Sequence, residues 1–241
     1  MRASTARRPA AGPNLPTLVP KLPVRFAAGA RPHGLAPGEL VKLHHSLAES
    51  LYTDRGVIAQ FVGPEPDAAI ESVVYDIAYI SAAWLGKRVL FVNGVGMQFD
   101  LGEQAGRRRK EPLLPGRVNI GDLEESITRV VGLELYQMRF PSMRGALDLA
   151  PTLRQIPEFL DRLRDSFDLV LVASPPASEA PTGVLLSRFV NGNVLVIEAN
   201  RTRAPVAAEL RDALSSSGGA VVGAILTRYQ SYVPRFLRRW L

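Results

Sequence analysis

The chain has 241 residues, with 29 Lys and Arg against 23 Asp and Glu and a formal net charge of +6 at pH 7, and an α/β sheet can bury this length as one core. It contains no cysteine, which excludes a disulfide framework, a thiol nucleophile and cysteine-ligated zinc. No apolar run approaches the roughly 18 to 20 residues of a membrane span and the N-terminus lacks the apolar stretch of a secretory signal, so we expect a cytoplasmic protein.

The basic residues are concentrated at the two ends of the chain. Residues 1–40 hold six basic side chains against one acidic, and residues 227–241 hold four against none. The ends therefore carry +5 and +4 of the total of +6, which leaves −3 for the middle. A mildly acidic middle argues against a nucleic-acid-binding face, whereas basic ends suit anionic lipid headgroups or an acidic partner.

Residues 1–36 are rich in Pro, Ala, Gly and Arg and lack apolar periodicity, which predicts a flexible arm whose simplest role is a tether. A helix is predicted from Gly38 to Leu51, because leucines recur there at spacings of three and four. On it, His44 and His45 are expected to lie on a solvated face rather than to bind a metal. The main domain is predicted to span residues 37–228.

The segment from Val57 to Trp84 has the outline of a nucleotide-binding strand, loop and helix. An apolar strand, Val57–Val62, leads to Gly63, and an apolar-periodic helix is predicted over residues 68–84. A working loop of this kind reads G-x-x-x-x-G-K-[ST], in which backbone N–H groups surround phosphates and the lysine reaches the outer ones.

The working residues of such a loop are missing. No lysine occurs between Lys42 and Lys87, and the acidic side chains of the loop would repel a triphosphate. Two prolines each remove an N–H donor. We therefore interpret the segment as a degenerate nucleotide loop. Its residues singled out here are Gly63, Glu65, Asp67, Glu71 and Ser72.

Five apolar strands follow one another in a recognisable order. Their motifs read V-I-A-x-x-x-G, G-K-R-V-L-x-V, F-D-L-V-L-V-x-S-P-P, G-N-V-L-V-I-E-A-N-R-T-R and V-V-G-A-I-L-T-R. In order and spacing they resemble the cytoplasmic tyrosine autokinase domain of bacterial exopolysaccharide assembly systems (CpsD/CapB-like), which belongs to the MinD/ParA-type P-loop ATPases. The resemblance covers residues 38–228 and implies a P-loop NTPase-like α/β fold, a doubly wound, mostly parallel sheet with helices on both faces.

The chain departs from this family at the metal-binding positions. In the family, the second strand ends in Asp-x-Asp and the third in an aspartate before Ser/Thr-Pro-Pro, which bind Mg²⁺. Asn93, Val95 and Ala173 stand at these positions. No metal site and no cofactor are therefore expected, with Mg-bound ATP or ADP as the alternative. Arg201 and Arg203 follow a strand where ligands of open α/β sheets bind, which makes them candidates for residual anion contacts.

The remaining segments complete the predicted sheet. A loop over residues 100–119 holds the cationic run Arg107–Lys110, which we expect to point into solvent. Further elements are a strand over residues 89–92, a helix over 121–131, a strand over 133–138, a helix with apolar positions over 156–163 after Pro151 and Pro157, strands over 169–172, 194–198 and 221–226, and a helix over 204–214.

The C-terminal residues 229–241 differ from the tyrosine-rich tail of the family. Only Tyr229 and Tyr232 remain as candidate phosphate acceptors. A short basic, aromatic end suits a membrane interface or a groove on a partner. The predicted contact residues are Arg235, Phe236, Arg238, Arg239 and Trp240.

These features favour a non-catalytic, pseudokinase-like component of exopolysaccharide biosynthesis and export over an enzyme. The resemblance implies that it docks on an inner-membrane co-polymerase of the chain-length-determinant type and is peripheral at that membrane. The alternative is a nucleotide-binding switch, or a tyrosine autokinase or ATPase with an atypical P-loop. Self-association is left open. The family uses a Glu-x-x-Arg-x-x-Arg helix for it, and here Glu39 is kept while Lys42 and His45 replace the two arginines.

Overall fold

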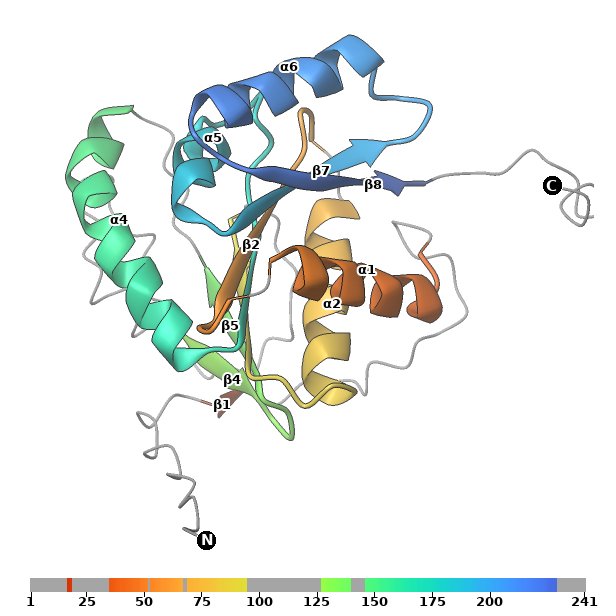
Figure 1. Ribbon diagram of the computed structural model, residues 1–241, viewed down its shortest axis with the longest axis vertical. Coiled ribbons are helices and arrows are strands. Elements are labelled where there is room, and N and C mark those ends of the chain that lie inside the picture. The colour runs from red at the N-terminus through yellow and green to blue at the C-terminus, as the bar shows by residue number, and fades with distance from the viewer. Residues whose placement is uncertain are drawn as a thin grey trace, which may run out of the picture.

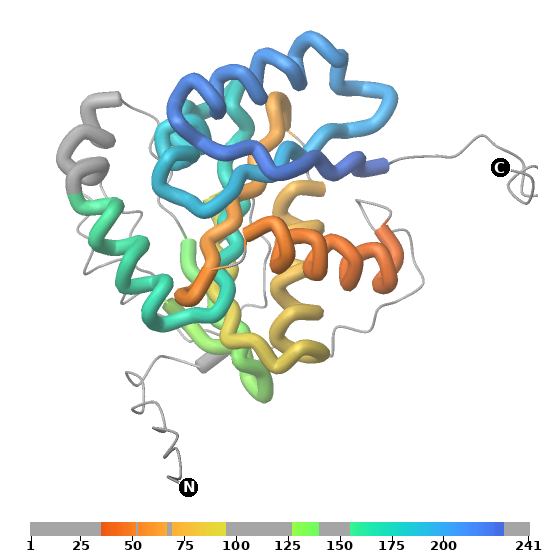
Figure 2. Tube along the Cα trace, in the orientation of Figure 1, coloured from red at the N-terminus to blue at the C-terminus, as the bar shows by residue number. Residues whose placement is uncertain are grey.

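The computed structural model describes residues 35–51, 53–66, 69–94, 127–139 and 146–228, together with the short strand Thr17–Leu18. Figure 2 traces the chain through these segments. Over residues 146–154 the helix is described without its side chains.

The described elements alternate between strands and helices along most of the chain (Figure 1). The helices are α1 (Pro37–Ser50), α2 (Ala69–Ala83), α4 (Ala146–Ser166), α5 (Thr182–Leu186) and α6 (Ala204–Ser216), with a 3-10 turn, η1 (Ser187–Phe189), after α5. The strands are β1 (Thr17–Leu18), β2 (Val57–Val62), β3 (Val89–Asn93), β4 (Thr128–Val130), β5 (Leu135–Arg139), β6 (Leu169–Ala173), β7 (Gly192–Glu198) and β8 (Val221–Thr227).

The strands form one sheet of eight in the order β1-β4-β5-β3-β6-β2-β7-β8. Every neighbouring pair is parallel except β4 and β5. The central strand β2 lies between β6 and β7, and β3 lies between β5 and β6. The doubly wound, mostly parallel architecture predicted from the sequence is therefore confirmed.

Helices cover both faces of the sheet, as Figure 1 shows with α4 on the side opposite α1 and α2. Side chains alternate along β2, so that Phe61 packs with α1 and α2 while Ile58 packs with α4. Val62 packs with Leu210 and Leu214 of α6. Because both faces are covered, the central strands read as continuous apolar runs rather than as alternating ones.

The helix predicted over residues 121–131 is wrong where the structure describes it. Thr128–Val130 forms β4, antiparallel to β5, and residues 121–126 lie outside the described residues. β-Branched residues favour a strand at this position, and Gly132, with a φ of +80°, makes the turn into β5.

Helix α4 begins at Ala146, well before the segment predicted from its apolar face. Pro151 and Pro157 lie inside this helix, whereas the sequence analysis placed both before it. A helical proline leaves one carbonyl without its amide partner. Pro157 is exposed, which places its ring on the solvent side of the helix.

The predicted N-terminal arm contributes one described element to the sheet. Thr17 and Leu18 pair in parallel with Arg129 and Val130 of β4. The arm residues 1–16 and 19–34 lie outside the described part of the chain. The tether role of the arm stays a prediction.

His44 does not lie on a solvated face, contrary to the prediction. Its Nδ1 lies 2.7 Å from the hydroxyl of Ser81, which donates its only proton to the carbonyl of Ile77 at 2.7 Å, so the histidine nitrogen must be the donor. Burial, and then Lys87 and His45, lower the pKa of His44. A neutral His44 therefore fixes α1 to α2, whereas His45 is exposed as predicted.

Candidate functional site

Three strand ends that the sequence singled out meet at one edge of the sheet. Ala173 at the end of β6 is in register with Phe61 of β2 on one side and with Asn93 of β3 on the other. The amide of Gly94 donates to the carbonyl of Ala173 at 2.8 Å. This edge, at the carboxyl ends of parallel strands, is where open α/β sheets bind their ligands.

The loop after β2 is tied to the turn after β6 through its carbonyl groups. The carbonyl of Gly63 accepts a hydrogen bond from Ala177 at 3.0 Å, and that of Pro64 accepts one from Ser178 at 3.1 Å. Pro64 and Pro66 have no N–H to offer a phosphate. The described part of the loop is thus held to the turn after β6 through its carbonyls, and two of its positions have no amide for a phosphate.

Apolar side chains occupy the positions of the catalytic lysine and hydroxyl. Counted from Gly63, the G-x-x-x-x-G-K-[ST] pattern places these groups at Ala69 and Ile70, both fully buried. A Cβ atom on Gly63 would lie 2.8 Å from Cδ1 of Ile70 and 3.1 Å from the carbonyl of Val196. Packing by itself therefore explains why this glycine is present.

Glu71 provides a buried carboxylate at the same edge. Its side chain extends from the first turn of α2 and accepts a hydrogen bond from Nδ2 of Asn93, and Glu71 is 4% exposed. Burial raises the pKa of Glu71, although the Asn93 hydrogen bond and the charge of Arg139 act in the opposite direction. Glu71 and Asn93 are both candidate residues of the sequence, but their contact depends on how α2 packs against β3 and has no signal along the chain.

The raised pKa makes a testable prediction for Glu71→Gln. The variant should be more stable than the parent by about 1 kcal/mol near neutral pH, because glutamine can still accept from Asn93 without burying a charge. A carboxyl whose pKa is higher in the folded state stabilises the fold below its ordinary value of 4.5 and loses that contribution as the pH rises through the folded pKa. The gain should therefore shrink toward zero as the pH falls to about 4.5.

Urea unfolding of both proteins across this pH range measures the difference. Glu65→Gln is the matched control, because Glu65 lies in the neighbouring loop and is only partly buried, and it should change little. A Glu71→Gln protein that is less stable near neutral pH would contradict this account and would assign a stabilising role to the charged carboxylate.

The other predicted contacts at this edge are engaged within the protein. Ser72 donates to the carbonyl of Ala69 at 3.1 Å, within its own helix. Arg201 forms an ion pair with Glu198 at 3.0 Å, and Glu198 also accepts from Arg228 at 2.7 Å. Arg203 is exposed just before α6. The anion contacts of Arg201 and Arg203 stay a prediction, and Arg201 already shares the Glu198 carboxylate with Arg228.

The structure describes only some of the residues predicted at the metal-binding positions and none of those predicted in the C-terminal tail. Ala173 is fully buried and Asn93 is bonded to Glu71. In the part of the chain that the structure describes, no group of three or more His, Asp or Glu side chains is arranged to hold a metal ion. The residues Asp67, Val95, Tyr229, Tyr232, Arg235, Phe236, Arg238, Arg239 and Trp240, and the run Arg107–Lys110, lie outside the described residues.

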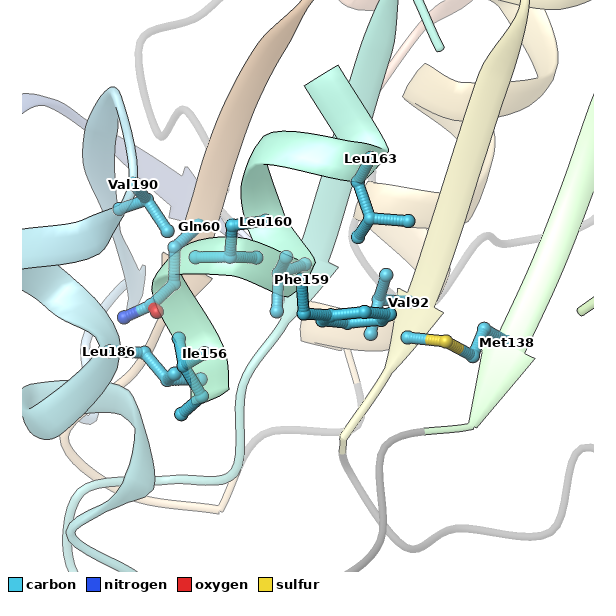
Figure 3. Close-up of a pocket in the computed structure, with 10 residues that line it drawn as sticks. Gln60, Val92, Met138, Ile156, Phe159, Leu160, Leu163, Leu186 and Val190 are labelled. Carbon is cyan, nitrogen blue, oxygen red and sulfur yellow. The ribbon is translucent and has the colours of Figure 1, made fainter. Parts of the chain in front are cut away.

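A small cavity lies on the face of the sheet that α4 covers (Figure 3). Its lining residues are Gln60, Val92, Met138, Ile156, Phe159, Leu160, Leu163, Val172, Leu186 and Val190. Gln60 is the polar member, and its Nε2 donates to the carbonyl of Gly183 at 2.6 Å. This lining offers neither a cation nor a carboxylate, so the cavity does not suit a nucleotide.

The fold is shared with bacterial tyrosine kinase domains. The kinase domain of the Escherichia coli tyrosine kinase ETK matches with a TM-score of 0.63 and 18% sequence identity, over 83% of this chain and 79% of that one. The VpsO kinase domain matches with a TM-score of 0.56 and 19% identity, over 80% and 97%. The cell division ATPase MinD of Pyrococcus furiosus matches with a TM-score of 0.53 and 21% identity, over 75% and 77%.

These likenesses confirm the fold that the resemblance implied, which is shared by the tyrosine kinase domains and by MinD. No protein-family model and no curated protein matches the sequence. None of the helices over the described residues is both long and apolar enough to span a bilayer.

Proposed function

We propose that this protein is a non-catalytic, pseudokinase-like member of the bacterial exopolysaccharide tyrosine autokinase group. It supports polysaccharide assembly and export by binding a partner rather than by transferring phosphate. The observation that carries the proposal is the occupied strand edge, where Ala69 and Ile70 stand at the lysine and hydroxyl positions and Glu71 holds Asn93.

Electrostatics support the loss of phosphoryl transfer. The reaction depends on cations that neutralise the developing charge of the transferred group, namely a lysine and Mg²⁺ held by carboxylates. Beside Asn93, which stands at a metal-binding position of the family, the described charged groups are the Glu71 carboxylate and Arg139 at the end of β5. The arginines after β7 and β8 lie at the far strands of the same edge. A buried carboxylate raises the cost of bringing in a triphosphate.

The partner proposed is an inner-membrane polysaccharide co-polymerase of the chain-length-determinant type. The basic ends of the chain support this role, because they suit contact with anionic headgroups or an acidic protein surface. On this proposal the protein is cytoplasmic and peripheral at the inner membrane through its partner. Tyr229 and Tyr232 would then be substrates of another kinase rather than of this chain.

Isothermal titration with ATP and ADP, with and without Mg²⁺ and up to millimolar ligand, tests the proposal directly. A catalytically competent tyrosine kinase domain of the same fold serves as the positive control. We expect no binding heat and no increase in melting temperature, since a ligand stabilises only a state that it binds. Micromolar, Mg²⁺-dependent binding would reject the proposal in favour of a nucleotide-binding switch with an atypical P-loop.

A further inference from the structure

The two edges of the sheet differ in how well they are protected. At one edge β1 has two residues, whereas at the other β8 has seven and pairs, among the described residues, only with β7. Proteins usually protect a long edge strand with charged residues, proline, bulges or a covering element. Val221–Thr227 contains no charged residue and no proline, and its register irregularity lies only at its start.

The backbone of β8 presents hydrogen-bonding groups on the side away from β7, where the structure describes no neighbouring strand. The carbonyl of Thr227 accepts from the amide of Ala199 at 3.0 Å, so it points toward β7. In a parallel strand the N–H and C=O of one residue point to the same neighbour and those of the next residue to the opposite side. The N–H and C=O groups of Leu226 and Ala224 therefore point away from β7.

The side chains along this edge leave room for another strand. Ala224 is exposed and Leu226 is 51% exposed. Helix α6 packs through Leu210 and Leu214 against the neighbouring strands and does not cover Leu226. A strand that adds to β8 would thus find an apolar side chain beside the backbone groups.

The described side chains at the carboxyl end of β8 carry more positive than negative charge. Among the described residues at this end, Arg201 and Arg228 share the Glu198 carboxylate, and Arg203 adds a further exposed guanidinium group. A segment that reaches this end with acidic residues would be attracted to it.

We propose that the outer edge of β8 binds an extended segment of a partner protein, with acidic residues of that segment beside Arg201, Arg203 and Arg228. The segment runs antiparallel to β8, the more stable pairing, so its acidic residues precede its paired residues. Backbone hydrogen bonds supply affinity, and Leu226 together with the arginines supplies selectivity. This inference does not depend on the loss of nucleotide binding, because the edge of β8 lies outside the degenerate loop.

Fluorescence anisotropy with a labelled, capped peptide tests the proposal on the full chain. In the probe, two glutamates precede a run of alternating threonine and valine, and the comparison peptide has glutamine in place of glutamate. The glutamate peptide should bind more tightly, by about fivefold at low salt, and the preference should fall as salt is added. Equal binding of the two peptides would overturn the role of the arginines.

Ala224→Pro removes one outward N–H without removing a donor from the β7 ladder, and it should weaken peptide binding by about fivefold. Arg201→Gln combined with Arg203→Gln should remove the glutamate preference, while Arg211→Gln on α6, the matched control, should not. If the proline variant has a melting temperature well below that of the parent, Leu226→Asp replaces it in the test. Residue 226 is exposed, and an aspartate there would repel the acidic probe.

Besides equal binding of the two peptides, three kinds of result would overturn the inference. The first is an absence of peptide binding up to millimolar concentration, or binding that a folded Ala224→Pro protein retains in full. The second is a concentration-dependent dimer, without peptide, that Ala224→Pro abolishes, which would assign the edge to a second copy of this chain. The third is binding of phosphatidylglycerol vesicles through Arg201 and Arg203 with no peptide binding, which would assign the arginines to a membrane.

Discussion

Replacing Ala173 with aspartate should lower the free energy of unfolding by about 3 kcal/mol or more and should not create a magnesium site. Ala173 is fully buried at the end of β6. A carboxylate there would lie next to Asn93, whose amide is already bonded to Glu71. It would stand near the buried carboxylate of Glu71, and repulsion between the two charges disfavours its ionised form.

Ala173→Asn is the matched control, because it has nearly the same size and no charge. Urea unfolding of both variants with and without Mg²⁺ and ATP separates the cost of charge from the cost of volume. The aspartate variant should be the less stable of the two at neutral pH, and the difference should narrow in acid as the carboxyl protonates. If Mg²⁺ with ATP restored its stability, the strand edge would still be competent to bind nucleotide and the proposed function would be wrong.

Gly56→Ala should cost about 3 kcal/mol or more, because no side chain fits at this position. A Cβ atom there would lie 2.0 Å from the carbonyl oxygen of Phe167 and 2.6 Å from that of Arg164. These are backbone atoms at the connection from α4 to β6, and the amide of Gly56 already donates to Arg164 at 3.1 Å. Relief of the clash would displace β2 from the centre of the sheet.

Gly38→Ala serves as the control for the same chemical change. A Cβ atom at Gly38 would meet nothing within 4 Å, and Gly38 lies in helix α1, where alanine should stabilise by about 0.5–1 kcal/mol. Thermal unfolding of the two variants should therefore shift in opposite directions. Equal, small shifts would show that the chain around Gly56 rearranges at little cost.

The frame of a nucleotide-binding domain persists here for reasons of packing. Gly63 leaves room for Ile70 and for the carbonyl of Val196. The turn at Pro175 and Pro176 leads directly to the amides that bond the carbonyls of Gly63 and Pro64. These contacts stabilise the fold whether or not a phosphate binds, which explains how the motif outlines can remain without the charged residues.

The central strands could be read from the sequence almost to the residue. Residues 57–62, 89–92 and 169–172 were predicted, and β2, β3 and β6 match them to within one residue at each end. Their side chains are buried on both faces of the sheet, so continuous apolar runs bounded by glycine, proline or polar residues mark them. The short strand β4 lacks this signal, since only Val130 of its residues is buried.

The sequence by itself determined the class of fold, the succession of apolar strands along the chain and the absence of a lysine and of strand-end carboxylates, since these follow from residue identity and periodicity along the chain. Only the tertiary structure decided that Glu71 bonds to Asn93, that His44 bonds to Ser81 and that Arg201 pairs with Glu198. The first two contacts join different elements, and the backbone turn after β7 sets the third. Their existence depends on the packing and register of the elements, which local propensity does not specify.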